Sequence, residues 1–365
     1  MRGVYRYTVR CEAKDPILLA AIEHWLKANH IGDVLEAGAL EAEVVRLEGE
    51  NAIEVRYAFA HREAFERYEQ EHAPRLRLES RSLFGDEIAW KRSQGATLFQ
   101  RDASSLRVRV IPYFRDNYAY LVHPITGNKP LPCIVVDPGD ALPILQALER
   151  YHLVIEAIFC THHHADHVGG LSALLEHFPS VPVYGSEYDM RHGRIPFQNR
   201  AIRDGDTIQG LGYPFQVMEV PGHTIGAITY VGPGFAFTGD TLFLAGCGRV
   251  FEGTMDGMYA SLMRLATLPQ STLLYVGHEY TQSNLRFAQW VEPNNQDLAK
   301  RIKLVSHLRA HGQPTVPSTL KEELATNPFL RCSSSEVMAF AASRGVIGSE
   351  AEVFAEIRRA KDAFT

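Results

Sequence analysis

The chain has 365 residues, of which 45% are hydrophobic and 22% are charged. This is the composition of a globular protein with enough apolar residues for two or three packed domains. The net charge of −6 excludes a general attraction to nucleic acid or to an anionic membrane, so an anionic ligand needs a local basic patch. No apolar run approaches the roughly 20 residues of a membrane span. Five scattered cysteines without a Cys-x-x-Cys pair, and an N-terminus without a signal-like apolar stretch, predict reduced thiols in a cytoplasmic protein.

Residues 1–102 are predicted to form a separate small α+β domain. Segments with strand-like alternation or helical apolar spacing follow one another in the order β-α-β-β-α-β. The predicted strands cover residues 4–9, 42–47, 52–59 and 88–91, and the predicted helices cover residues 16–26 and 62–71. This order is typical of the ferredoxin-like split βαβ unit. A polar segment, residues 100–105, is the expected linker to the rest of the chain.

The role of this first domain stays open between two hypotheses. Its histidines have no acidic or cysteine partner in a ligand spacing, so we interpret them as surface or helix-cap residues: His24, His30, His61 and His72. With His72-Ala73-Pro74-Arg75-Leu76 and Phe84-Gly85, the stretch resembles a small uncharacterised ferredoxin-like domain family, which implies no catalytic role. The domain is either a regulatory or partner-binding module or, as we prefer, a unit that pairs sheet edges into a homodimer.

A histidine-rich run, Thr161-His162-His163-His164-Ala165-Asp166-His167, follows a buried strand predicted at residues 154–160. Neutral imidazoles and a carboxylate at this short spacing point to one centre and suit zinc or a neighbouring transition metal. Four candidate ligands on one loop exceed what one catalytic ion takes, since such an ion keeps a position open for water. The run therefore predicts two metal ions. The alternative is a solvated patch of histidines.

Residues 105–280 alternate strands and helices, which predicts an α/β sandwich of two sheets covered by helices. Strands are predicted at residues 106–111, 118–123, 132–137, 154–160, 181–184 and 273–276, with further β segments over 207–243, and helices at 141–151, up to 178, and at 258–268. Three more candidate ligands follow strands: His223 after Pro221-Gly222, Asp240 after an apolar run, and His278 after another. Each alone is more typical of a hydrogen-bonded structural residue. Together with the histidine-rich run they predict a site of seven ligands.

These motifs are similar to those of a known family. Gly222-His223-Thr224, Thr238-Gly239-Asp240 and Gly277-His278-Glu279-Tyr280, together with the histidine-rich run, resemble the metallo-β-lactamase fold. Gly246-Cys247-Gly248-Arg249 and Asn327-Pro328-Phe329-Leu330-Arg331 extend the match to the glyoxalase II (hydroxyacylglutathione hydrolase) family, over residues 106–365. The resemblance implies a four-layer αββα sandwich over residues 105–280 and a helical substrate-binding domain over residues 281–365. Helices are predicted there at residues 282–290, 295–311, 319–324, 334–343 and 350–364.

The resemblance also implies the roles of the ligands. One metal ion is held by His162, His164 and His223, and the other by Asp166, His167 and His278. Asp240 bridges the two ions, and His163 is no ligand. With Asp166 and Asp240 as the catalytic carboxylates, a hydroxide between the two ions attacks the substrate. Zinc is the expected metal, although these ligands also accept iron or manganese. Asp137 either orients a ligand histidine or simply ends its strand.

In the same family the peptide part of the substrate is held by basic and aromatic residues. The matching positions are Arg249, Phe251, His278, Tyr280, Arg358 and Lys361. Arg358 and Lys361 are three residues apart on one predicted helix face, which by spacing alone is also typical of a solvated face. Phe251 stands where a tyrosine is common, so one hydroxyl contact is expected to be missing, and Arg249 replaces a lysine. Cys247 is interpreted as a buried structural thiol, because the reaction needs no cysteine nucleophile.

The resulting expectation is a cytoplasmic hydrolase that converts S-2-hydroxyacylglutathione, typically S-lactoylglutathione, to glutathione and a 2-hydroxy acid. This is the second step of methylglyoxal detoxification. One alternative is a persulfide dioxygenase with a single iron on the same fold, which does not need Asp166, His167 and His278 as a second ligand set. Another is a binding protein with a relict site. Neither nucleic acid nor membrane is an expected partner.

Overall fold

The computed structural model describes residues 5–85, 87–96, 106–128 and 130–364. The chain divides into two compact units. Unit 1 consists of Met1–Arg107 with Pro124–Asn128 and Ser306–Gln313, and unit 2 of Val108–His123, Lys129–Val305 and Pro314–Thr365. The predicted linker at residues 100–105 lies outside the described residues. The predicted domain boundaries near residues 102 and 280 stay predictions.

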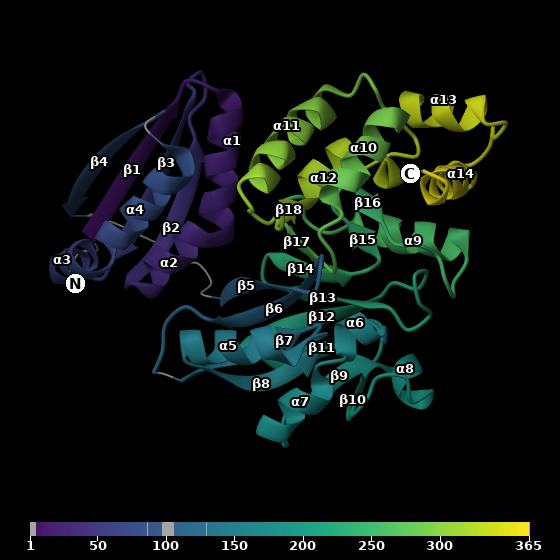
Figure 1. The fold of residues 1–365 in the computed structure, drawn as a ribbon, viewed down its shortest axis with the longest axis horizontal. Coiled ribbons are helices and arrows are strands. Elements are labelled where there is room, and N and C mark those ends of the chain that lie inside the picture. The colour runs from purple at the N-terminus through teal and green to yellow at the C-terminus, as the bar shows by residue number, and fades with distance from the viewer. Residues whose placement is uncertain (1–4, 86, 97–105, 129, 365) are drawn as a thin grey trace. The chain divides into compact units, whose positions relative to one another are not determined.

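The sheet of unit 1 is antiparallel, with the strand order β2-β3-β1-β4 (Figure 1). Its strands are β1 (Tyr5–Ala13), β2 (Ala39–Arg46), β3 (Ala52–Phe59) and β4 (Ile88–Ala96). Alternate residues of β1, among them Val9 and Cys11, are buried beneath the helices, as the period of two requires. This strand order, together with the order of elements along the chain, confirms the predicted ferredoxin-like arrangement.

Unit 1 contains more helix than the sequence predicted. Helix α1 (Pro16–Trp25) begins at the N-cap Asp15, whose carboxylate accepts a hydrogen bond from Ile17 N at 2.8 Å. It continues through a π-helical turn, Leu26–His30, into α2 (Ile31–Glu36). Helix α3 (Arg62–Glu71) agrees with the prediction. Helix α4 (Ala73–Phe84) was missed, although Pro74 in its first turn is a typical helix start.

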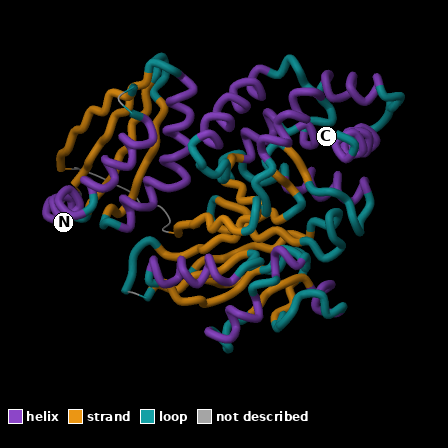
Figure 2. The backbone as a smooth tube through the Cα atoms, viewed as in Figure 1, coloured by secondary structure: helices purple, strands orange, loops and turns teal. Residues whose placement is uncertain are grey.

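Unit 2 contains two six-stranded sheets, which Figure 2 shows as two sets of orange strands. The first, in the order β10-β9-β8-β7-β6-β5, consists of β5 (Leu106–Tyr113), β6 (Asn117–Pro124), β7 (Leu131–Val136), β8 (Leu153–Phe159), β9 (Val183–Ser186) and β10 (Arg200–Ile202). The second, in the order β11-β12-β13-β14-β17-β18, consists of β11 (Thr207–Gly210), β12 (Tyr213–Glu219), β13 (Ile228–Gly232), β14 (Phe235–Gly239), β17 (Leu273–Val276) and β18 (Ser318–Thr319). A small hairpin pairs β15 (Leu242–Phe243) with β16 (Gly246–Cys247).

Aromatic side chains fill the space between the two sheets. The ring of Phe159 on β8 stacks on that of Tyr230 on β13, with centroids 4.4 Å apart, and meets Phe215 on β12 at 5.5 Å. Tyr120 on β6 contacts Phe237 on β14 at 5.2 Å. Because these rings come from both sheets, they lock the sheets face to face and set the distance between the strand ends that carry the site.

Helices cover the outer faces of both sheets and complete the four-layer αββα sandwich that the resemblance predicted. Helices α5 (Ala141–Tyr151) and α7 (Leu171–His177) share a core with the first sheet. Helix α9 and most of the C-terminal helices share a core with the second sheet. The helices from α9 onward are α9 (Met255–Leu265), α10 (Thr281–Val291), α11 (Gln296–Ala310), α12 (Leu320–Thr326), α13 (Ser335–Ser343) and α14 (Glu350–Asp362). Two short helices, α6 (Ala165–Val168) and α8 (Glu187–Arg191), lie in the loops.

Across the described ranges, no helix has the length and the apolar composition needed to cross a bilayer.

Candidate active site and metal centre

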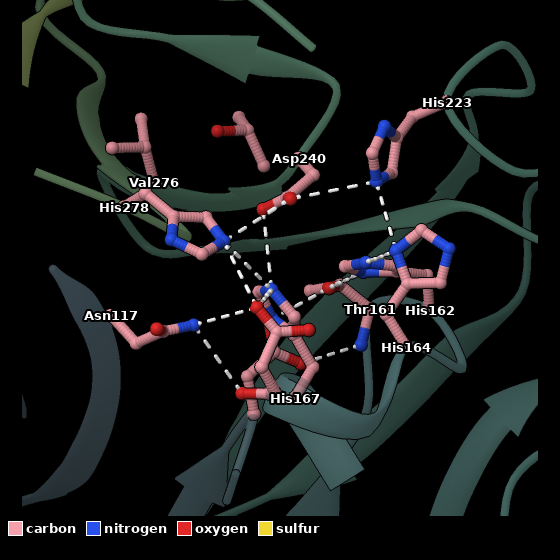
Figure 3. A network of polar contacts seen from close by, with 12 residues as sticks. Asn117, Thr161, His162, His164, His167, His223, Asp240, Val276 and His278 are labelled. Atoms are coloured by element: carbon pink, nitrogen blue, oxygen red, sulfur yellow. Dashed lines mark hydrogen bonds and ion pairs between the residues drawn. The ribbon is translucent and has the colours of Figure 1, made fainter. Parts of the chain in front are cut away.

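All seven predicted ligands meet at one edge of the sandwich, in loops that follow strands (Figure 3). The histidine-rich run follows β8 of the first sheet and supplies four of them. The other three follow strands of the second sheet: His223 after β12, Asp240 after β14 and His278 after β17. Since the aromatic core holds the two sheets together, these strand ends face each other across a short gap. His163 points elsewhere, with Nδ1 3.6 Å from Asp189 Oδ1 and Nε2 3.7 Å from Glu252 Oε1.

The first group of ligand atoms consists of three histidine nitrogens. His162 Nε2 and His223 Nε2 lie 3.2 and 3.1 Å from His164 Nδ1. A zinc ion with ligand bonds of about 2.0–2.1 Å holds tetrahedral ligands about 3.3 Å apart, so these separations match the edges of such a tetrahedron. His162 and His223 are buried, and His164 is half-buried.

The second group combines two imidazoles with a carboxylate. His278 Nε2 lies 3.3 Å from His167 Nε2 and 3.4 Å from Asp166 Oδ2. Asp240 lies between the two groups: its Oδ2 is 3.5 Å from His223 Nε2 and 3.3 Å from His278 Nε2, and its Oδ1 is 3.3 Å from His167 Nε2. One carboxylate therefore faces ligand nitrogens of both groups.

The outer nitrogens of four ligand histidines are held by fixed acceptors, which determines their tautomers. His223 Nδ1 donates to the Arg249 carbonyl at 2.8 Å, and His278 Nδ1 to Asp116 Oδ1 at 3.0 Å. His167 Nδ1 donates to Asp137 Oδ2 at 3.0 Å. These contacts leave an Nε2 lone pair pointing into the site.

The fourth such histidine, His162, is oriented through Thr161. The Thr161 hydroxyl donates to Asp137 Oδ2 at 2.7 Å, so its oxygen is free to accept from His162 Nδ1 at 3.1 Å. Asp137 thereby supports both His162 and His167, one through Thr161 and one directly. Of its two interpretations, the structure favours the one in which it orients ligand histidines.

The donor set fits divalent cations. Imidazole lone pairs face one another at 3.1–3.3 Å, an approach that is repulsive unless a cation lies between them. The buried Oδ1 of Asp240 accepts no hydrogen bond from any described residue. A carboxylate oxygen in that position is costly to bury without a positive partner.

The electrostatics of the site differ among its histidines. Although burial opposes it, Asp240 raises the pKa of His167 to about 9 and also raises that of His278, so metal binding at His167 releases a proton. Burial lowers the pKa of His162 well below its ordinary value, and burial also lowers the pKa values of His164 and His223, so these imidazoles are neutral. Burial opposes ionisation of Asp240, but His167 and His278 outweigh it and hold the pKa of that carboxyl well below its usual range. Asp240 is therefore an anion, which is the form in which a carboxylate binds a metal ion.

Sequence reasoning missed three groups that hold this site in place. Asp116 orients His278, and Asn117 Nδ2 donates to Asp166 Oδ2 at 2.9 Å. The Tyr113 hydroxyl donates to the carbonyl of Asp166 at 2.5 Å. All three lie around the turn between β5 and β6. The polar pair Asp116-Asn117 after a predicted strand was the available signal, because the other site residues have the same strand-end position.

Replacing Asp137 with asparagine is expected to lower metal affinity about 10- to 100-fold. Asparagine can still accept from Thr161 N, but its amide group then faces His167 Nδ1 donor to donor, which disfavours the tautomer that presents Nε2. Competition against a chelator, followed by element analysis, measures the effect. Asp140→Asn is the control, since Asp140 only caps α5 through Leu142 N at 3.0 Å. Equal metal retention in the two variants would contradict a role for Asp137.

Aromatic and basic side chains border the site on two sides. The Phe251 ring lies 5.1 Å from the ring of His223, and the Tyr280 ring stacks on His278 at 4.7 Å. Arg249 is exposed, and its Nε lies 3.5 Å from Asp362 Oδ1. Lys361 Nζ lies 3.4 Å from the hydroxyl and from the carbonyl of Ser283.

Arg358, a predicted substrate-binding residue, is buried and does not lie on a solvated helix face. Its side chain is only 3% exposed, and Nη1 donates to the Cys247 carbonyl at 2.8 Å while Nη2 donates to Asp362 Oδ1 at 3.0 Å. Through these contacts Arg358 holds the segment before Arg249 in place, and its side chain does not face solvent. Cys247 is buried, as predicted, and burial raises the pKa of its thiol.

The C-terminal helices also hold the segment that follows Asp240. Glu323 on α12 accepts a hydrogen bond from Ala245 N at 2.8 Å, and Asn327 Nδ2 donates to the Gly246 carbonyl at 2.9 Å. Asn284 Nδ2 on α10 donates to the Leu244 carbonyl at 3.1 Å. Helices from the end of the chain thus position a loop that lies between a ligand and the basic border.

Comparison with known proteins finds three family models along the chain. Residues 113–278 match the metallo-β-lactamase superfamily, residues 279–364 match the hydroxyacylglutathione hydrolase C-terminus, and residues 4–94 match a domain of unknown function, DUF4286. Two solved structures are similar: the B3 metallo-β-lactamase BLEG-1 (23% identity, 62% of this chain and 100% of that one, TM-score 0.47) and ETHE1 from Myxococcus xanthus (25%, 70% and 100%, TM-score 0.45).

This chain aligns with almost the entire length of its curated relatives. The hydroxyacylglutathione hydrolase of Aliivibrio fischeri strain MJ11 is 47% identical over 259 residues, which are 71% of this chain and 100% of that protein. That of Xanthomonas campestris pv. campestris strain B100 is 46% identical over 261 residues, or 71% and 99%. That of Aeromonas hydrophila is 47% identical over 262 residues, or 70% and 99%.

Fold and site together define a divalent-metal hydrolase of the metallo-β-lactamase superfamily. The helices that follow the sandwich identify the family within this superfamily more narrowly, as do the relatives that span both the sandwich and these helices. The chain belongs to the hydroxyacylglutathione hydrolase family, glyoxalase II, and catalyses hydrolysis of S-2-hydroxyacylglutathione thioesters to glutathione and a 2-hydroxy acid. This confirms the reaction expected from the sequence over that of a persulfide dioxygenase.

Proposed function

We propose that the seven residues hold two divalent metal ions, both zinc, and that the pair forms the catalytic centre for S-lactoylglutathione. His162, His164 and His223 hold one ion, Asp166, His167 and His278 hold the other, and Asp240 serves both. The observation that carries this proposal is the position of Asp240, whose two oxygens face nitrogens of both groups. A single ion would leave the ligand atoms of one of the two groups in a buried site without a cation to bind their lone pairs.

Bound there, the two ions would supply a hydroxide at neutral pH and polarise the thioester carbonyl. The chain's own contribution is to keep the ligands in place before substrate arrives. Asp166 is fixed by Asn117, and Asp240 is held ionised by the surrounding imidazoles. Tyr113 and Asn117 restrain the helix turn that carries Asp166 and His167, so these ligands need no rearrangement during the reaction.

The basic and aromatic border is the proposed binding site for the glutathione part, with residues 281–365 as the substrate-binding region. Glutathione carries two carboxylates, and Arg249 and Lys361 are the cations best placed to meet them. Tyr280 and Phe251 offer aromatic faces beside the ligand histidines, and Phe251 supplies no hydroxyl. Arg358 takes part by holding the Cys247 carbonyl and Asp362, which sets the position of Arg249.

The Michaelis constant for S-lactoylglutathione is expected to rise as the pH increases above about 8. Burial, together with the nearby guanidinium groups of Arg358 and Arg286, lowers the pKa of Lys361 to about 8. Below that pH the ammonium is charged and attracts a substrate carboxylate; above it the charge is lost. Lys361→Arg, which stays charged, is expected to remove the rise, and Lys361→Met to raise KM about tenfold at pH 7.

Steady-state kinetics between pH 6.5 and 9.5 provide the measurement. Lys300→Met on α11 is the matched control, because Lys300 is exposed and contacts only Asp297 at 2.9 Å among the described residues. The assignment of Lys361 is wrong if the arginine variant keeps the rise in KM, or if kcat rather than KM changes in the methionine variant.

The metal content tests the proposal of two zinc ions. Element analysis of the purified full chain is expected to give two equivalents of zinc, together with turnover of S-lactoylglutathione. One iron per chain with oxygen uptake on glutathione persulfide would instead support the dioxygenase mechanism at this site. Two equivalents of iron or manganese with full turnover would correct the metal and leave the seven-ligand assignment intact.

The remaining assignments concern location and assembly. We propose a cytoplasmic enzyme, on the ground of five free, buried cysteines. The homodimer through residues 1–102 also stays a prediction, and β2 and β4 are the two outer strands of that sheet available for pairing. One chain has a mass of 40.9 kDa, and light scattering on the full chain is expected to give twice that mass. A monomer at micromolar concentration would rule out this pairing.

A further inference from the structure

A polar cavity of about 370 Å³ lies in unit 1 between α4 and β4. Its walls include Arg77, Ser80 and Arg81 from one face of the helix and Ile88, Trp90 and Arg92 from the strand. A second, much smaller pocket shares some of these walls and is also lined by Tyr7, Trp25 and His30. The residues of the proposed catalytic centre contribute nothing to it, and the surrounding domain has no assigned role.

The register of β4 turns its polar residues toward the core. Trp90 is paired with Cys11 and Arg92 with Val9, and residues directly opposite each other in an antiparallel pair share one face. Cys11 and Val9 are 0% and 8% exposed, so this is the face that the helices cover. Arg92 itself is exposed, so a carboxylate partner for its guanidinium is common at such a position but not required.

That partner is missing for two of the three arginines. Arg77 forms an ion pair with Glu69. Among the residues that the structure describes, no carboxylate is paired with Arg81 or Arg92, and none of those lining the cavity carries one. Two exposed guanidinium groups thus line one cavity without a carboxylate partner.

Two buried nitrogen atoms in the same place lack partners as well. Trp90 Nε1 and His30 Nδ1 are inaccessible to solvent and make no hydrogen bond to any described residue. The indole nitrogen can only donate, and buried donors in native proteins are nearly always paired. His30, interpreted from the sequence as a surface or cap residue, stands at the start of α2 without a side-chain cap hydrogen bond; it is half-buried, lines the smaller pocket and stacks on Trp25 at 4.3 Å.

We propose that this cavity binds a small organic anion, an organic phosphate or a polycarboxylate. Arg81 and Arg92 contact its charged oxygens, and Trp90 Nε1 donates to a further acceptor. Its volume lies within the range of about 300–1,000 Å³ typical of small-molecule sites. A nucleic acid is disfavoured, because residues 5–96 contain more acidic than basic side chains and offer no extended basic surface.

Calorimetric titration of the full-length enzyme with three probes tests this proposal. Adenosine monophosphate and tricarballylate represent the two sources of anionic oxygens, and inorganic phosphate tests an anion without an organic part. At least one organic probe is expected to bind with a Kd of about 1–100 µM, and phosphate at least about tenfold more weakly. Failure of both organic probes to bind in this range overturns the proposal.

Three variants locate the binding. Arg92→Gln is expected to weaken the bound probe about tenfold or more, and Trp90→Phe, which keeps an aromatic ring and removes the N–H, about threefold or more. Lys91→Gln is the matched control, since Lys91 neighbours Arg92 on the opposite face and pairs with Glu12. Thioester turnover is expected to be unchanged in all three, and circular dichroism with thermal unfolding of each variant shows whether unit 1 folds as in the unsubstituted chain. The site is refuted if Lys91→Gln weakens binding as much as Arg92→Gln, or if neither cavity variant weakens it.

Discussion

Replacing Asp240 with asparagine is expected to lower kcat for S-lactoylglutathione about 1,000-fold or more and to reduce the metal content of the purified enzyme. The carboxylate faces His167, His223 and His278 at 3.3–3.5 Å. An amide at this position removes one negative charge and turns an NH₂ group toward at least one ligand nitrogen. The two metal groups then lose the anion that they share.

Kinetics and element analysis on the same preparations distinguish loss of metal from loss of chemistry. Asp206→Asn serves as the control, because Asp206 is an exposed carboxylate of the same unit whose partner is Arg203 N at 2.8 Å. An Asp240→Asn enzyme with a full metal complement and near-normal kcat would end the proposal that this residue serves both ions. A variant that keeps its metals but has lost turnover would assign Asp240 mainly to the chemistry.

Removing the metal is expected to abolish turnover and to lower the midpoint of thermal unfolding by about 5–10 °C. The metal-free site leaves the Asp240 carboxylate and five imidazoles in a buried position where only each other's charges compensate them. Metal bound to the native state and not to the unfolded chain stabilises the native state by mass action. Without the metal, burying the carboxylate and the imidazoles at this site costs free energy and opposes folding.

Dialysis against a chelator followed by calorimetry and kinetics measures both effects. Restoring zinc is expected to recover activity and the original midpoint, and the number of equivalents required reports the number of sites. Saturation at one equivalent with full activity would contradict the dinuclear centre. Calcium, which prefers six to eight oxygen ligands, is the control ion and is expected to restore neither.

Local patterns in the chain were enough to predict most of the secondary structure and the ligand residues. Helix α5 and strand β17 have the predicted limits. The leucine spacing of a helix and a short apolar run are local patterns, and the surrounding fold did not change the structure that they predict. The candidate ligands were recognisable since each is a polar residue in a loop that follows a predicted strand. By contrast, α4 was missed because its polar, arginine-rich sequence has weak apolar periodicity.

The sequence by itself determined the chemistry of this protein: histidines and carboxylates at strand ends can hold metals whatever surrounds them, and their spacing identified the family. Only the tertiary structure decided how they are held. Asp116 and Asn117 lie far from the ligands in the sequence, and they reach the site because β6 begins at the edge of the sandwich where β17 ends. Arg358 is buried and Arg92 faces a cavity, since the direction of a side chain depends on the register and packing of neighbouring elements, which the chain's local pattern does not contain.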